Sequence, residues 1–223
     1  MSDSEVLAKL EEARRLVARA AGEAGRDPSE VEIQAVTKTH DAEAIRPLLA
    51  AGHRSFGENR VQEAQAKWPA LRAAYPDAAL SLIGPLQSNK AADAVALFDR
   101  IETVDREKIA RALADEMEKQ GRRLPVLVQV NIGEEDQKSG VLPTEAVAFA
   151  RACQETHGLN VRGLLCIPPQ GQPPAPYFAL LDKLADEAGL PERSMGMSND
   201  YEAAVSLGAT RVRLGSALFG ERG

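Results

Sequence analysis

Apolar and polar positions along this 223-residue chain alternate between two periods, one typical of helices and one typical of strands. A first helix that ends by Gly25 is predicted from apolar residues at helical spacing, namely Val6, Leu10, Ala13 and Val17. Residues 31–38 then alternate with a period of two, which predicts a β-strand. One face of this strand is mostly apolar, whereas the other is unusually polar and carries Glu32, Gln34, Val36 and Lys38.

The same succession of strand and helix repeats to the end of the chain. Further strands are predicted at 53–57, 79–83, 101–104, 124–131, 161–167, a short segment ending near 194, and 210–214. The helices between them are expected to follow Asp41, Asn59, Ser88, Asp105, Gly140, Pro176 and Asp200, with Asp41 and Asp105 as N-caps. Repeated βα units without a break in composition predict a single-domain parallel (β/α)8 TIM barrel over residues 1–223. An open doubly wound sheet is the alternative, but no G-x-G-x-x-G motif supports it.

Composition narrows the class of protein. Hydrophobic residues make up 44% and charged residues 27%, which is the balance of a globular chain with a sizeable core. The formal charge of -6 argues against nucleic acid or an anionic membrane as the main partner. No apolar run has membrane-spanning length and the first residues resemble no export signal, so we expect a cytoplasmic protein. Cys153 and Cys166 lack metal or redox spacing and are expected to be reduced, structural thiols.

Lys38 is the candidate for covalent chemistry. Functional residues of α/β barrels gather where strands end, and the polar face of residues 31–38 ends in this lysine. Strands buried on both sides usually read as continuous apolar runs, so a polar face indicates the mouth of the barrel. Considered alone, a lysine at a strand end is more often a solvated side chain.

Two groups of small residues predict a phosphate site at the same mouth. Ser194-Met195-Gly196-Met197-Ser198 is expected to form the loop after the seventh strand, and Gly215-Ser216 follows the eighth. Phosphate commonly binds beside these two loops in α/β barrels. The alternative is that both groups serve only as tight turns and helix caps. A phosphate cradle opposite Lys38 would suit a phosphorylated aldehyde.

Eight segments carry a resemblance to a known family: residues 35–38, 56–59, 83–90, 129–131, 138–140, 163–168, 194–200 and 213–220. In these segments the chain resembles the pyridoxal phosphate homeostasis proteins, which are single-domain proteins similar to the N-terminal barrel of alanine racemases. The runs Gly-Pro-Leu-Gln-Ser-Asn-Lys and Ser-Met-Gly-Met-Ser are the most specific parts of the match. The chain departs from many members at Leu80-Ser81-Leu82, where they have Trp-His-Phe, and in a shorter, proline-rich region between Pro168 and Ser194.

The resemblance implies that pyridoxal 5'-phosphate (PLP) is bound as a Schiff base on Lys38, with Arg213 near the pyridine nitrogen. The other residues expected to bind the cofactor are Asn59, Ser194, Met195, Gly196, Ser198, Gly215 and Ser216. Simpler roles remain open, namely a salt bridge for Arg213, a helix cap for Asn59 and core packing for Met195. Lys90 and Lys138 are expected to be solvated surface residues. We assign no catalytic residue and no metal ligand.

Two functions from different classes fit this site. The first is a non-enzymatic protein that buffers PLP or delivers it to apo PLP-dependent enzymes, as a monomer or weak homodimer. The second is a PLP-dependent amino-acid racemase with weak activity. Racemisation needs acid and base groups on both faces of the substrate, and alanine racemases supply one of them from a second domain that this sequence does not show. We therefore expect the first function. A third possibility is a partner-binding barrel in which PLP binding is vestigial.

Overall fold

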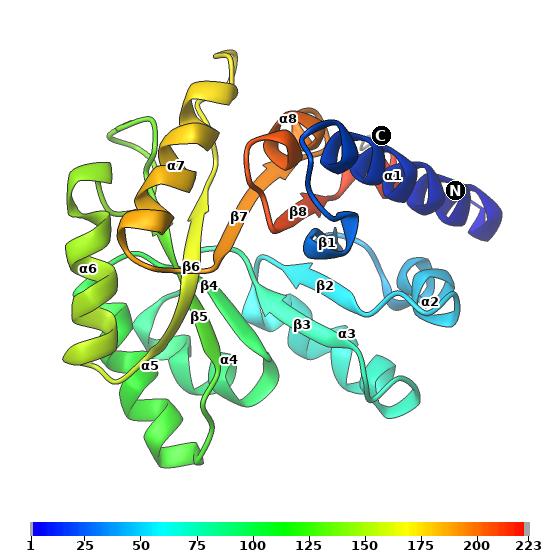
Figure 1. Cartoon of the computed structure of the whole chain (residues 1–223). Coiled ribbons are helices and arrows are strands. Elements are labelled where there is room, and N and C mark those ends of the chain that lie inside the picture. The colour runs from blue at the N-terminus through cyan, green and yellow to red at the C-terminus, as the bar shows by residue number, and fades with distance from the viewer. Residues whose placement is uncertain (1, 221–223) are drawn as a thin grey trace.

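Eight parallel strands close into a barrel in the order β1 to β8 in the computed structural model, which describes residues 2–220 (Figure 1). β1 pairs with β2 on one side and with β8 on the other, where Gln34 lies opposite Arg213. The predicted (β/α)8 barrel is therefore confirmed over the open sheet. The strands are β1 (Glu32–Val36), β2 (Ser55–Glu58), β3 (Ala79–Leu82), β4 (Arg100–Val104), β5 (Pro125–Val130), β6 (Asn160–Cys166), β7 (Glu192–Met197) and β8 (Arg211–Leu214).

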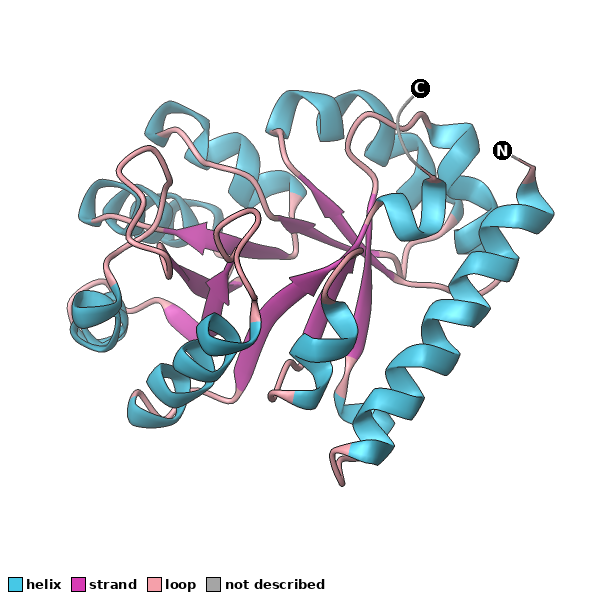
Figure 2. Ribbon diagram, turned by 90° about the horizontal axis from the view of Figure 1, so that it is seen from above, coloured by secondary structure: helices cyan, strands magenta, loops and turns pink. Residues whose placement is uncertain are grey.

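Helices surround the strands on the outside of the barrel (Figure 2). They are α1 (Asp3–Glu23), α2 (Ala42–Ala50), α3 (Val61–Ala74), α4 (Ala91–Leu97), α5 (Glu107–Gln120), α6 (Pro143–Glu155), α7 (Ala175–Glu187), α8 (Tyr201–Ser206) and α9 (Ser216–Phe219), with short 3₁₀ turns η1 (Pro28–Glu30) and η2 (Ser88–Lys90). The helix before the first strand, α1, packs against α8 and α9 beside the point where the barrel closes (Figure 1). None of the described helices is long and apolar enough to cross a bilayer.

Local sequence explains where several helices begin and end. Asp41 caps α2 as predicted, because its carboxylate accepts the N–H of Ala44 at 2.9 Å. Gly121 ends α5 in the left-handed conformation, which glycine adopts without steric cost. The expected cap of α5 is wrong, since Arg106 holds the N-cap position and the carboxylate of Asp105 pairs with the Arg106 guanidinium instead.

The seventh strand is longer than predicted. It continues to Met197, so most of the segment expected as a loop is part of β7. The pairing of β7 with β8 shifts register between Ser194 and Met197, as at a β-bulge. Gly196 lies within this shift at φ +93°, and a Cβ there would stand 2.6 Å from the Cβ of Ala204 in α8. Gly196 therefore marks a bend packed closely against a helix, where the sequence pattern indicated a strand end.

The two sides of the barrel wall differ in chemistry. Outward-facing strand residues such as Phe56 and Leu80 pack against helix residues such as Trp68 and form the main hydrophobic core. The inward side carries several buried polar and charged residues, which are Gln34, Glu102, Ser194, Arg211 and Arg213. The polar face predicted for residues 31–38 is thus the interior face of the barrel, with Gln34 fully buried in it.

Candidate cofactor site

A cavity of about 920 Å³ opens at the carboxyl ends of the strands. Its lining includes residues at or just beyond the carboxyl ends of β1, β2, β3, β6, β7 and β8. Six of the nine predicted cofactor-binding residues lie on its wall: Lys38, Asn59, Ser198, Arg213, Gly215 and Ser216. Segments far apart in the sequence therefore meet at one mouth, as expected for the functional face of a parallel barrel.

Lys38 lies two residues beyond β1, in a segment that α3 holds from outside the barrel. The buried ammonium of Lys67 donates to the carbonyl oxygens of Thr37 at 2.7 Å and His40 at 2.8 Å. Thr39 has a left-handed φ of 68°, and its N–H donates to Glu63, one helical turn before Lys67. Together these contacts fix the backbone on both sides of Lys38.

The Lys67 ammonium is balanced by a fully buried carboxylate. Glu58 Oε1 lies 2.8 Å from Lys67 Nζ, and it also accepts from Thr37 Oγ1 at 2.5 Å and Trp68 Nε1 at 3.1 Å. Three donors on one oxygen offset part of the cost of burying the carboxylate, whose Oε2 has no hydrogen-bond partner among the described residues. The sequence did not indicate this arrangement. Glu63 and Lys67 are spaced four residues apart, which is typical of an ion pair on the exposed face of a helix.

Arg213 forms the inner wall of the cavity and is only 5% exposed. Its Nη1 donates to Ser194 Oγ at 2.8 Å and its Nη2 donates to the Cys166 carbonyl oxygen at 2.9 Å. Burial lowers the pKa of the guanidinium, and the nearby charge of Glu102 acts in the opposite direction. Among the described residues both direct partners of Arg213 are neutral oxygens, so the salt bridge considered as its alternative role is not formed.

Ser198 joins the two small-residue segments on one side of the cavity. Its Oγ accepts the N–H of Gly215 at 3.3 Å and that of Ala217 at 3.0 Å. Ser216 belongs to the same wall. Asp200 also lines the cavity, and its carboxylate is engaged by the N–H of Met197 at 2.6 Å. This side of the cavity thus carries two serines, and backbone amides orient the hydroxyl of Ser198.

The other three predicted residues do not reach the cavity wall. Ser194 points into the barrel beneath Arg213, Met195 is fully buried in the hydrophobic core, and Gly196 packs against α8. The reason is the extension of β7, whose alternation sends neighbouring side chains to opposite faces. Core packing, the simpler role considered for Met195, is the one observed.

Asn59 is a cavity residue and not a helix cap, because Arg60 occupies the N-cap position of α3. Gly84 approaches its backbone so closely that a Cβ would stand 2.1 Å from the Asn59 carbonyl oxygen. Lys138, expected to be a solvated surface residue, also lines the cavity and pairs with Glu135 at 2.5 Å. Lys90 lies outside this cavity lining and pairs with Asp93 at 3.6 Å.

Comparison with known proteins shows the family of the chain. The family model described as "Alanine racemase, N-terminal domain" matches residues 7–223. A pyridoxal phosphate homeostasis protein of Pseudomonas aeruginosa is 43% identical over 213 residues, which cover 92% of this chain and 91% of that protein. Its counterpart in Escherichia coli K12 is 38% identical over 228 residues, with 98% and 97% covered. The chain belongs to the pyridoxal phosphate homeostasis protein family.

The similarity to solved structures extends over the whole barrel. PipY of Synechococcus elongatus, solved with PLP bound, matches with a TM-score of 0.78 at 38% identity, over 92% of this chain and all (100%) of that one. The crystal structure of an unknown protein from Bifidobacterium adolescentis matches with a TM-score of 0.91 at 32% identity, over 97% of this chain and 95% of that one. Alanine racemase of Clostridium difficile shares the fold, with a TM-score of 0.71 at 16% identity, over 98% of this chain and 57% of the racemase.

Proposed function

We propose that this chain holds PLP covalently through Lys38 and acts in intracellular PLP homeostasis, by buffering the cofactor or delivering it to apo PLP-dependent enzymes. The proposal rests chiefly on one observation: Lys38, Arg213 and the two serines Ser198 and Ser216 line the same cavity of about 920 Å³. The names of the relatives and the PLP-bound PipY structure support it.

The residues present fit three groups of PLP: its aldehyde, its phosphate and its pyridine nitrogen. The amine of Lys38 would condense with the aldehyde, forming a C=N bond and releasing one water. The hydroxyls of Ser198 and Ser216 would receive the phosphate, with the N–H groups of Gly215 and Ala217 orienting the Ser198 hydroxyl. Arg213, as a cavity residue rich in N–H donors, would face the pyridine nitrogen.

The charge on Arg213 bears on catalysis. When bound, PLP supplies an electron sink whose strength depends on protonation of its ring nitrogen. A guanidinium does not give up its proton, so Arg213 would donate a hydrogen bond to that nitrogen and leave it unprotonated. Such a site retains PLP but activates it weakly. We place storage or delivery before the alternative, a weak amino-acid racemase, because the relatives are named homeostasis proteins.

Reductive trapping tests the covalent part of the proposal. Protein incubated with PLP is treated with borohydride, digested and mapped by mass spectrometry. We expect the reduced adduct on Lys38 in the wild type and its loss from this position in Lys38→Ala. Lys138→Ala is the matched control, since Lys138 lines the same cavity and should not affect the adduct. Trapping that depends on Lys138 but not on Lys38 would refute the assignment.

A second assay separates buffering or delivery from catalysis. The PLP-loaded protein is mixed with an apo PLP-dependent enzyme, and recovery of that enzyme's activity is followed. In parallel, racemisation of L-alanine by the loaded protein is measured. We expect transfer of PLP and only trace racemisation. Racemisation at rates typical of enzymes, on the order of 1 per second or faster, would favour the alternative.

A further inference from the structure

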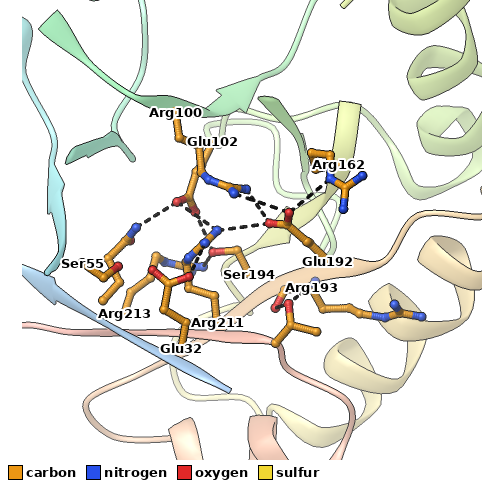
Figure 3. A network of polar contacts seen from close by, with 12 residues as sticks. Glu32, Ser55, Arg100, Glu102, Arg162, Glu192, Arg193, Ser194, Arg211 and Arg213 are labelled. Carbon is orange, nitrogen blue, oxygen red and sulfur yellow. Dashed lines mark hydrogen bonds and ion pairs between the residues drawn. The ribbon is translucent and has the colours of Figure 1, made fainter. Parts of the chain in front are cut away.

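A network of polar contacts that includes Arg213 lies inside the barrel (Figure 3). Its centre is Glu102 of β4, which is fully buried. The carboxylate contacts residues of β1, β7 and β8, none of which pairs with β4 in the barrel wall. These contacts therefore cross the interior. Burying a carboxylate is costly, and the partners on the opposite strands offset this cost by donating to it.

One line of contacts runs from Glu102 to the cavity. Ser194 Oγ donates to Glu102 Oε2 at 2.8 Å, and Ser194 Oγ in turn accepts from Arg213 Nη1 at 2.8 Å. Since a hydroxyl has a single proton, the carboxylate fixes its direction and turns its lone pairs toward the guanidinium. Figure 3 shows Ser194 between the two charged groups.

The remaining contacts keep the Glu102 carboxylate in place. Its Oε1 accepts from Gln34 Nε2 at 2.9 Å and lies 3.4 Å from Arg211 Nη1. Arg211 has other acidic partners, with Glu32 at 2.5 Å and Glu192 at 3.3 Å. The positive charge of Arg211 is therefore shared among three carboxylates, while Ser194 links Glu102 to Arg213.

We propose that Glu102 and Ser194 are positioning residues for Arg213, which fix the direction of its guanidinium at the inner wall of the cavity. The inference rests on the proposed function, in which Arg213 faces the ring nitrogen of PLP. It gives Ser194 a role different from the phosphate contact predicted from sequence. Ser194 acts through Arg213, without touching the cofactor.

The test compares three variants of the full chain. Ser194→Ala removes the link without changing charge, and Glu102→Gln keeps the shape of the side chain but removes its charge. Glu192→Gln is the matched control, because Glu192 belongs to the same network but contacts Arg100, Arg162 and Arg211 rather than Ser194 or Arg213. The dissociation constant of PLP and the pH dependence of the bound-PLP absorption are measured for each.

We expect Ser194→Ala and Glu102→Gln to weaken PLP binding about tenfold, the effect of losing one charge-assisted hydrogen bond, and to shift the pH profile. Glu192→Gln should match the wild type in both, even where its thermal stability falls. If Glu102→Gln does not fold, Ser194→Ala still decides. A double variant, Ser194→Ala with Arg213→Lys, should bind PLP no more weakly than Arg213→Lys alone, because Ser194 acts through Arg213.

The negative results distinguish failure of the positioning role from failure of the proposed function. If the wild type traps PLP on Lys38 but Ser194→Ala and Glu102→Gln match it in affinity and pH profile, the positioning role is wrong and the proposed function stands. An equal loss in Glu192→Gln would likewise overturn the role, since it would show a general effect on the barrel. If the wild type forms no Lys38 adduct, the proposed function fails and the positioning role fails with it.

Discussion

Lys67 Nζ lies 2.7 Å from the carbonyl oxygen of Thr37, so an ammonium on α3 holds the backbone one residue before Lys38. The same ammonium holds His40 at 2.8 Å and pairs with the buried Glu58 at 2.8 Å. The loop that carries the proposed cofactor lysine is therefore supported from outside the barrel. Its position is set by α3 as well as by β1.

Replacing Lys67 by methionine should destabilise the fold and impair the site. The change leaves the Glu58 carboxylate buried without its cation, which is expected to lower the free energy of unfolding by about 3 kcal/mol. Urea denaturation measures this loss, and the yield of borohydride-trapped adduct reports the site. Lys183→Met is the control, because Lys183 pairs with Glu187 on an exposed helix face and such pairs contribute at most about 1 kcal/mol. Equal effects of the two substitutions would contradict the account.

The stability of the protein should fall below neutral pH because of His53. This ring is 6% exposed, and burial lowers its pKa to about 4. The unfolded chain takes up a proton near pH 6.5, whereas the folded chain resists until pH 4. Stability is therefore intact above pH 6.5 and is lost as the pH falls toward 4, by up to about 3 kcal/mol. His53→Gln should show a flatter pH dependence of the unfolding free energy, and an unchanged slope would refute the assignment.

Both cysteines should be unreactive in the folded protein. Cys153 and Cys166 are buried, and burial raises the pKa of each thiol to about 12. At pH 8 only about one thiol in ten thousand would be ionised. An aromatic disulfide reagent should therefore label both thiols only after denaturation. Rapid labelling of the native protein would show that one of them is accessible.

Gly196→Ala should destabilise the barrel by about 2 kcal/mol, because the backbone there has φ +93° and the new methyl would stand 2.6 Å from Ala204. Gly22→Ala is a matched control within α1, where nothing lies within 4 Å of the added carbon. That change should be neutral or stabilising by up to about 1 kcal/mol. Thermal unfolding of both variants checks the prediction, and a tolerant Gly196 would contradict the described packing of β7 against α8.

The periodic parts of the chain were predictable because their spacing reports burial directly. Alternation along residues 31–38 placed Gln34 and Lys38 on the interior face, and the βα repeats indicated the closed barrel. The end of β7 was not predictable in this way. Gly196 interrupts the pattern as a strand end would, yet it is a bend within the strand. Only the packing against α8 distinguishes the two.

The contacts that support the cavity wall could not be predicted, for a different reason. Glu102 contacts Gln34 across 68 residues of sequence and Ser194 across 92. Lys67 contacts Thr37 across 30 residues, from a helix position that looks solvent-exposed. Such pairs arise from the closed geometry of the barrel, which periodicity does not encode. The wall of the cavity could thus be predicted in large part, whereas the residues that support it required the structure.

The most direct test of the central claim is the visible absorption spectrum of the purified protein titrated with PLP, for the wild type and for Lys38→Ala. If Lys38 holds PLP covalently, the wild type develops a saturable band distinct from that of free PLP, and Lys38→Ala does not. The same saturable band in Lys38→Ala, or no band in either protein, would contradict the account.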